Sequence, residues 1–195
     1  ELSKNSENRN RIMSFLQSIV GVSSYLVLMR YVVSILGLEG VGLWSMTVGV
    51  VSFIRLMDLS GAAGLARMVA TKSDSSCEQA YYVDTMSLFV IVLYAGLCVV
   101  GFSPLLYVLH DSTPPEQWPL VEGLLTWALL SLILNVFGAC QLSTIDGIGR
   151  ADIRSAINII SFVIFIVVAM SFIEESGLLG VAYAQFCQFA FTAIV

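Results

Sequence analysis

The sequence predicts an all-α protein, a polytopic transmembrane bundle of six helices. Apolar residues make up 57% of the 195 residues and charged residues only 12%, about half the charge of a typical soluble domain. Mean hydropathy is +0.88. Most of the apolar runs reach the roughly 20 residues that a helix needs to cross a bilayer. The predicted helices are 12–36, 42–70, 82–109, 120–145, 153–173 and 177–195, the last of them truncated.

The first two helices are separated by a short turn. Residues 12–36 follow a polar start, and Leu38, Glu39 and Gly40 turn the chain into residues 42–70. A polar loop leads to the third helix, and the loop after it contains two adjacent prolines, which cannot continue a helix.

The turn DGIGRADIR joins the fourth helix to the fifth. Glu174 and Glu175 close the fifth helix, and Gly177 opens the sixth. The chain begins with glutamate and reaches Val195 inside an apolar run, so we expect it to be a fragment of a longer protein.

Basic residues alternate between the predicted loops, which predicts the sidedness of the bundle. Short cytoplasmic loops retain lysine and arginine. The basic residues of the N-terminal segment and of alternate loops are Lys4, Arg9, Arg11, Arg67, Lys72, Arg150 and Arg154, and the acidic residues of the other loops are Glu39, Asp111, Glu116, Glu174 and Glu175. We therefore expect a multi-pass protein whose N-terminus is cytoplasmic.

A charged pair lies in the middle of the second predicted helix. Arg55 is roughly 20 Å along the helix from Gly42, near the bilayer midplane, where a charge is costly. Asp58, three residues on, shares a helix face with it and can pair with it. Small residues that permit close helix approach follow, namely Gly61, Ala62, Ala63, Gly64 and Ala66. We predict that this helix is the wall of a polar cavity; the alternative is a structural ion pair that fixes helix register.

The remaining chemistry of the sequence argues against several other functions. The net charge is −5, and most basic residues are explained by topology, so nucleic-acid binding is not expected. A Gly-rich phosphate loop and a nucleophile with a neighbouring base are both missing, so we do not expect an enzyme. His110 stands alone and the cysteines form no CxxC motif, so neither a metal nor another cofactor is expected.

Three stretches resemble the bacterial oligosaccharide flippases. LGLEGVGLWSM followed by LMDLSGAAGLAR is similar to the first loop and second helix of the Wzx-type O-antigen transporters, which belong to the multidrug/oligosaccharidyl-lipid/polysaccharide superfamily. IDGIGRADIRSAINII and GLLGVAYAQ resemble the turn before the fifth helix and the start of the sixth. The matching residues are Gly37, Glu39, Gly42, Trp44, Asp58, Gly61, Gly64, Arg67, Gly149, Arg150 and Asn158. Ser60, where glycine is usual, and Arg30, one turn early, depart from the pattern.

The resemblance implies two six-helix bundles around a central cavity, with residues 1–195 as the N-terminal bundle. It implies transport of an undecaprenyl-diphosphate-linked oligosaccharide, such as the lipopolysaccharide O-antigen repeat, from the cytoplasmic to the periplasmic leaflet of the inner membrane by alternating access. The implied partners are that lipid-linked substrate, membrane lipids, the C-terminal half of the transporter and a polysaccharide polymerase complex.

A flippase needs fixed positive charge and hydrogen-bonding groups in a hydrated path. Arg55 and Arg30 suit the diphosphate, because guanidinium binds phosphate oxygens with two bonds. Asp58 would orient Arg55. Weaker candidates are Arg67, which topology also explains, and the amides Asn135, Gln141, Asn158, Gln185 and Gln188, which would contact sugar hydroxyls or join helices.

Three alternatives stay open: an exporter of drugs, an exporter of the peptidoglycan precursor lipid, and a non-transporting scaffold of a polysaccharide synthase. Two arginines against one aspartate argue against cationic drugs. Full export by cavity mutants that copurify with a synthase would favour the scaffold.

The topology makes a direct prediction. The loop beside Ser112 contains no lysine or arginine, so we expect it to be periplasmic. An enzyme that is active only in the periplasm should therefore be active when it is fused after Ser112, and a fluorescent protein that fluoresces only in the cytoplasm should stay dark at the same site. Fusion activity measured in intact cells checks this, and a cytoplasmic reporter at Ser112 would overturn the assignment.

Overall fold

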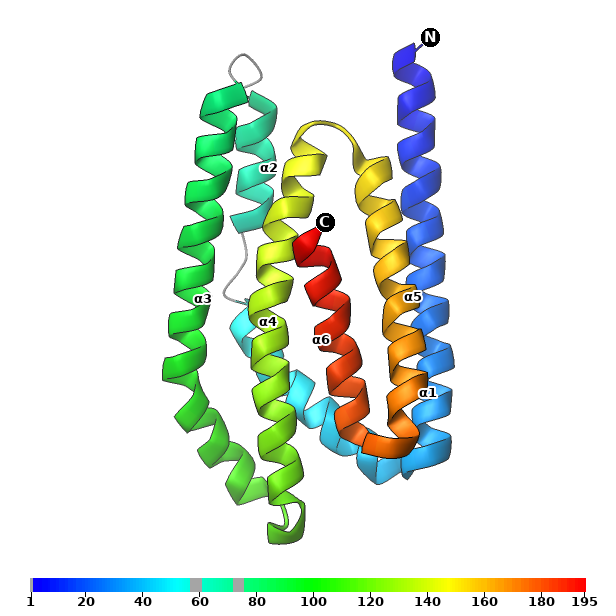
Figure 1. Cartoon of the computed structure of the whole chain (residues 1–195), viewed down its shortest axis with the longest axis vertical. Coiled ribbons are helices and arrows are strands. Elements are labelled where there is room, and N and C mark those ends of the chain that lie inside the picture. Colours follow the sequence, from blue (N-terminus) through cyan, green and yellow to red (C-terminus); the bar gives the residue numbers. More distant parts are fainter. Residues whose placement is uncertain (1, 57–60, 72–75) are drawn as a thin grey trace.

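The computed structural model is entirely helical apart from short connections over the residues it describes, which are 2–56, 61–71 and 76–195; of residues 2–7, 50–56, 61–63, 76–79 and 112 only the helical backbone is described. The described elements are α1 (Leu2–Leu56), α2 (Gly61–Thr71), α3 (Ser76–Ser112), the short 3-10 helix η1 (Pro115–Gln117), α4 (Trp118–Gly147), α5 (Ala151–Ser176) and α6 (Leu178–Ile194) (Figure 1). The predicted all-α class is confirmed.

Four helical stretches in this part of the chain are long and apolar enough to cross a membrane. They are Asn8–Gly49, Ala80–Asp111, Pro115–Gly147 and Ala151–Ser176, and α6 is a shorter apolar helix. The chain is therefore a multi-pass membrane protein.

The bend in α1 lies at Gly37, one residue before the turn predicted over Leu38, Glu39 and Gly40. Gly37 has φ 71° and ψ −177°, whereas the residues on both sides are helical. Only glycine adopts this backbone region readily, because a Cβ would clash there. The helix therefore changes direction at a single residue, and we call residues 2–36 the first arm and 38–56 the second arm of α1 (Figure 1).

The predicted helix 42–70 is represented by the second arm of α1 and by α2. Asp58 falls in residues 57–60, which lie outside the described residues, and for Arg55 only the backbone is described. Helices occupy the other predicted positions, with most ends within six residues of the prediction, but the first helix begins at Leu2, ten residues earlier than predicted, because the polar N-terminal segment is also helical. Helix α3 continues through Pro104 and bends in its second half (Figure 1), as expected where proline removes a backbone hydrogen bond.

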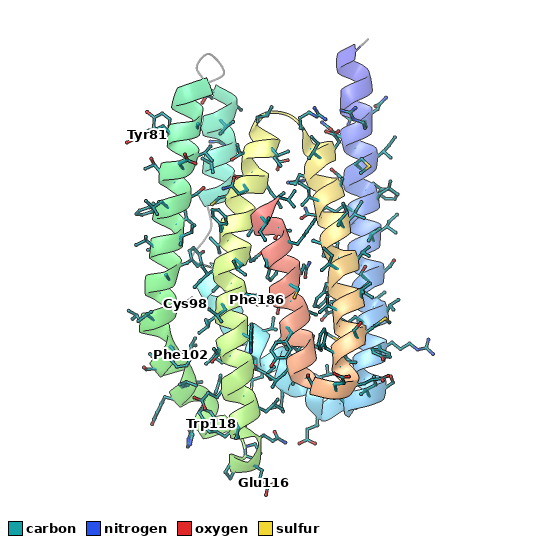
Figure 2. All side chains as sticks on the ribbon, in the orientation of Figure 1. Tyr81, Cys98, Phe102, Glu116, Trp118 and Phe186 are labelled. Atoms are coloured by element: carbon teal, nitrogen blue, oxygen red, sulfur yellow. The ribbon has the colours of Figure 1, made fainter. Side chains whose placement is uncertain are left out.

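Helix α4 is the centre of the bundle and packs against α1, α2, α3 and α6. On one side it forms an apolar core with α2 and α3, where Cys98 and Phe102 of α3 approach it (Figure 2). On the other side, Leu124 of α4 joins a second core with α1, α5 and α6. Because α4 belongs to both cores, it holds the two groups of helices together.

Helices α5 and α6 form a hairpin around Gly177, which has φ 57°. A Cβ at Gly180 would lie 2.6 Å from both the carbonyl carbon and the carbonyl oxygen of Phe172. Real Cβ atoms do not approach a backbone this closely, so Gly180 permits the close contact between α5 and α6.

Substitution of this glycine should destabilise the protein. We expect Gly180→Ala to lower the free energy of unfolding by about 1–3 kcal/mol, because the added methyl group must push the α5 backbone away. Thermal unfolding in detergent would measure it. Gly96→Ala in α3 is the matched control: nothing lies within 4 Å of its added Cβ. Equal stability of the two variants would contradict the close contact.

Candidate functional site

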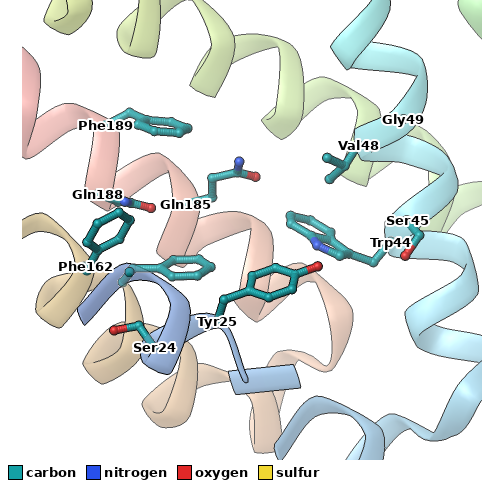
Figure 3. A pocket seen from close by; sticks show the side chains of 12 residues that line it. Ser24, Tyr25, Trp44, Ser45, Val48, Gly49, Phe162, Gln185, Gln188 and Phe189 are labelled. Carbon is teal, nitrogen blue, oxygen red and sulfur yellow. The ribbon is translucent and has the colours of Figure 1, made fainter. Parts of the chain in front are cut away.

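A cavity of about 510 Å³ lies between the two arms of α1 and helices α5 and α6 (Figure 3). We call it the aromatic cavity. Its described lining residues are Gly21, Ser24, Tyr25, Trp44, Ser45, Val48, Gly49, Phe162, Phe165, Gln185, Gln188 and Phe189. The volume falls within the roughly 300–1,000 Å³ of small-molecule sites.

The bend at Gly37 creates this cavity, because it brings the two arms of α1 to opposite sides of one space. Ser24 and Tyr25 come from the first arm, and Trp44 and Ser45 come from the second. Figure 3 shows the side chains of Tyr25 and Trp44 directed toward one another across the cavity. From the helix predicted to be the wall of a polar cavity, Trp44, Ser45, Val48 and Gly49 line this aromatic cavity. The predicted polar cavity beside Arg55 and Asp58 stays a prediction.

Five aromatic side chains give the cavity its character. Tyr25 and Trp44 come from α1, Phe162 and Phe165 from α5, and Phe189 from α6. Gly21 leaves room for one of them, since a Cβ there would lie 3.1 Å from Cε2 of Phe162. The aromatic rings therefore face the cavity from three helices.

Two amides on α6 supply the polar groups. Gln185 and Gln188 are three residues apart and share a helix face, and Gln188 is only 8% exposed. Within the described residues, neither side chain makes a hydrogen bond. Each amide can donate and accept a hydrogen bond, so the pair can bond to the donor and to the acceptor of a hydroxyl group on a ligand.

The position of α6 is set by aromatic packing. Trp127 of α4 makes edge contacts with Tyr183 and Phe186 of α6, with ring centroids 4.8 and 5.2 Å apart. Figure 2 shows Phe186 near the middle of the bundle. These contacts fix the rotation of α6, and with it the direction of both amides.

The polar groups of the aromatic cavity lie at a depth where they need hydrogen-bond partners. The lining residues of α5 and α6 lie near the middle of these helices. At that depth in a bilayer, an unpaired amide costs several kcal/mol unless water or a ligand satisfies it. The aromatic cavity is therefore expected to hold water or a polar ligand.

A second cavity, of about 380 Å³, lies between α2, α4 and α5, and its described lining includes Ala66, Asp146, Arg154 and Asn158. Nη1 of Arg154 donates to Oδ2 of Asp146. Oδ1 of Asp146 and Nε of Arg154 are buried and make no hydrogen bond within the described part of the chain. The ion pair joins α4 to α5 close to their shared turn.

The first arm of α1 is attached to α5 at both ends. Near the N-terminus, Nδ2 of Asn10 donates to the carbonyl of Gly149, its Oδ1 accepts from the backbone N–H of Asp152, and Arg9 pairs with Asp152. At the far end, the hydroxyl of Tyr31 donates to Glu174 over 3.1 Å. The first arm and α5 therefore form one continuous wall of the aromatic cavity.

Of the predicted site residues, Gln185 and Gln188 line the aromatic cavity and Asn158 lines the second cavity, whereas four others lie outside both. Arg30 is exposed on the first arm and Arg67 is exposed on α2, while Asn135 and Gln141 are half-buried on α4. None of these four lines either of the two cavities within the described residues. The proposed roles of Arg55 and Asp58 remain predictions.

Sequence reasoning missed several cavity residues. Trp44 entered the sequence analysis only as one of the residues that carry the flippase resemblance, but it is buried and lines the aromatic cavity. Arg154 was assigned to topology alone, but it lines the second cavity, between α2, α4 and α5, together with Asp146. Tyr25 and Phe162 gave no signal, because aromatic residues are ordinary in membrane helices; their spacing is informative only once the bend at Gly37 is known.

The aromatic cavity should be reachable from water. In a variant without the four native cysteines, we expect Ser45→Cys to react with a membrane-impermeant maleimide at least about tenfold faster than Val99→Cys. Val99 is 77% exposed on α3 and lies outside the lining of the aromatic cavity, so it controls for surface exposure alone. Labelling rates in membrane vesicles check this. Similar slow labelling at both positions would contradict a hydrated cavity.

In the comparisons with known proteins, no family model, no curated protein and no solved structure matches this chain. The similarity to the flippases therefore depends on the sequence motifs quoted above. The structure adds a multi-pass helical bundle with an aromatic and amide-lined cavity among the described residues.

Proposed function

We propose that this chain is the N-terminal bundle of a transporter that moves an undecaprenyl-diphosphate-linked oligosaccharide across the inner membrane. The observation that carries the proposal is the aromatic cavity, with its five rings and two amides near the middle of the bundle. Alternating access would expose this cavity first to the cytoplasm and then to the periplasm. The reaction makes and breaks no covalent bond.

A sugar chain needs this kind of surface inside a membrane. Its hydroxyl groups lose their water on entry, so they need groups that donate and accept hydrogen bonds, as Gln185 and Gln188 can. Its ring C–H bonds carry slight positive charge and pack well on the negative face of an aromatic ring. Tyr25, Trp44 and Phe162 offer such faces.

The diphosphate needs a cation, and Arg55 is the best candidate. It belongs to the second arm of α1, roughly 9 Å along the helix from Gly49 at the edge of the cavity. Asp58 would hold Arg55 when no substrate is bound. Arg30 and Arg67 are exposed and would meet the headgroup only outside the aromatic cavity.

The competing functions fit these observations less well. An exporter of cationic drugs would use aromatic rings together with a carboxylate, and the described lining of the aromatic cavity contains no acidic residue. A non-transporting scaffold has no need for unpaired amides at the middle of a membrane. A flippase for the peptidoglycan precursor has the same chemical requirements and is the second candidate, because it also carries sugars on a lipid diphosphate.

Replacement of Arg55 tests the proposal in the complete protein. We expect Arg55→Ala to reduce export at least about tenfold, because one charge-assisted contact to phosphate is worth about 1.5–3 kcal/mol. Surface polysaccharide in a deletion strain carrying each variant measures export. Lys4→Ala removes a cation from the chain's N-terminal segment and should export normally.

The deletion strain provides the control for function itself. Loss of the gene should remove surface polysaccharide and leave lipid-linked oligosaccharide on the cytoplasmic leaflet. Normal polysaccharide with altered drug sensitivity would favour the drug exporter. Wild-type export by stably inserted Arg55→Ala would refute the role of this arginine.

A further inference from the structure

We propose that the aromatic cavity binds an uncharged sugar unit and discriminates against sugars that carry a carboxylate. This inference rests on the proposed function and specifies the substrate class of the same site. It starts from the charge of the lining, because every described lining residue is neutral.

The charged groups described near the ends of the cavity walls, the exposed Arg30 among them, lie outside the cavity lining. Glu174 accepts from Tyr31 at one end of the first arm, and Arg9 pairs with Asp152 at the other. Arg154 is paired with Asp146 in the second cavity, between α2, α4 and α5. None of these side chains lines the aromatic cavity, so none is available to a charged sugar there.

An acidic sugar would pay a large cost in this environment. A carboxylate at the middle of a membrane loses its water, and a site without a cation cannot compensate that loss. A neutral sugar loses only hydroxyl hydration, which the amides of Gln185 and Gln188 can replace. The lining therefore favours the neutral sugar by the absence of a partner charge rather than by shape.

The geometry also separates the two parts of a lipid-linked substrate. The sugar would lie among Tyr25, Trp44 and the two amides, whereas the diphosphate would bind the arginine farther along the second arm. Gln188 is the more informative amide, because the residue is buried and its side-chain amide makes no hydrogen bond to another described residue, although its backbone carbonyl accepts from Thr192. Its loss should affect neutral sugar binding directly.

Sugar binding to the complete protein in lipid nanodiscs tests the inference. The probes are maltotriose and chitotriose, both neutral, and trigalacturonic acid, which has the same number of sugar rings. Trp44 lines the cavity, so its fluorescence should change when a sugar binds. Only the part of the fluorescence change that is missing in Trp44→Phe is counted as binding. We expect the better neutral probe to bind at least about tenfold more tightly than the acidic one.

Three variants test whether the Gln188 amide and the lack of a cation cause the preference for neutral sugars. Gln188→Leu should weaken the neutral probe about tenfold, and Gln17→Leu, the same change on α1 outside the cavity lining, should not. Gln185→Arg should reverse the preference, because it supplies the absent cation.

Equal or tighter binding of trigalacturonic acid to the wild type would overturn the inference, as would no response to either neutral probe. These outcomes leave the export assay in the deletion strain unaffected. A failure of that assay would refute the proposed function, whereas a failure of the sugar titration alone would refute only the neutral-sugar assignment.

Discussion

The bend at Gly37 is the constraint on which the aromatic cavity depends. Its backbone conformation is accessible to glycine and strained for other residues, and it turns one helix of 55 residues into two arms. Tyr25 and Trp44 are far apart along a straight helix, but the bend places them on the same cavity. Without it, the aromatic rings of α1 would be distributed along an ordinary membrane helix.

Among the described residues, the two walls of the cavity that α1 supplies differ in where polar contacts hold them. The first arm is joined to α5 by hydrogen bonds and an ion pair at both ends, through Asn10 and Tyr31. The second arm is attached at its start, where Gln117 donates to Glu39. A transporter that alternates its access needs such a division, because some elements must keep the site intact while others move.

The distribution of charge follows from the cost of burial. The described ion pairs join the ends of helices, at Asp146 with Arg154 and at Asp152 with Arg9, whereas every described residue that lines the aromatic cavity is neutral. In a low-dielectric medium an unpaired charge costs far more than an unpaired amide, whose hydrogen bonds a water molecule can supply. The proposed sugar site, whose described lining is uncharged, needs only water to satisfy its amides when no sugar is bound.

The sequence alone determined the class of the protein and most helix positions, because hydrophobic run length is a local property that the bilayer imposes. It also placed Gln185 and Gln188 among the candidate sugar contacts, and both line the cavity. Only the tertiary structure decided which residues share a site. Trp44, read locally, resembles an interface marker, and Arg154 resembles a topological signal. The cavity of Trp44 depends on the bend at Gly37 and on the rotation of α6, and the cavity of Arg154 depends on how α2, α4 and α5 pack together. These arrangements are set by packing between residues distant in the chain.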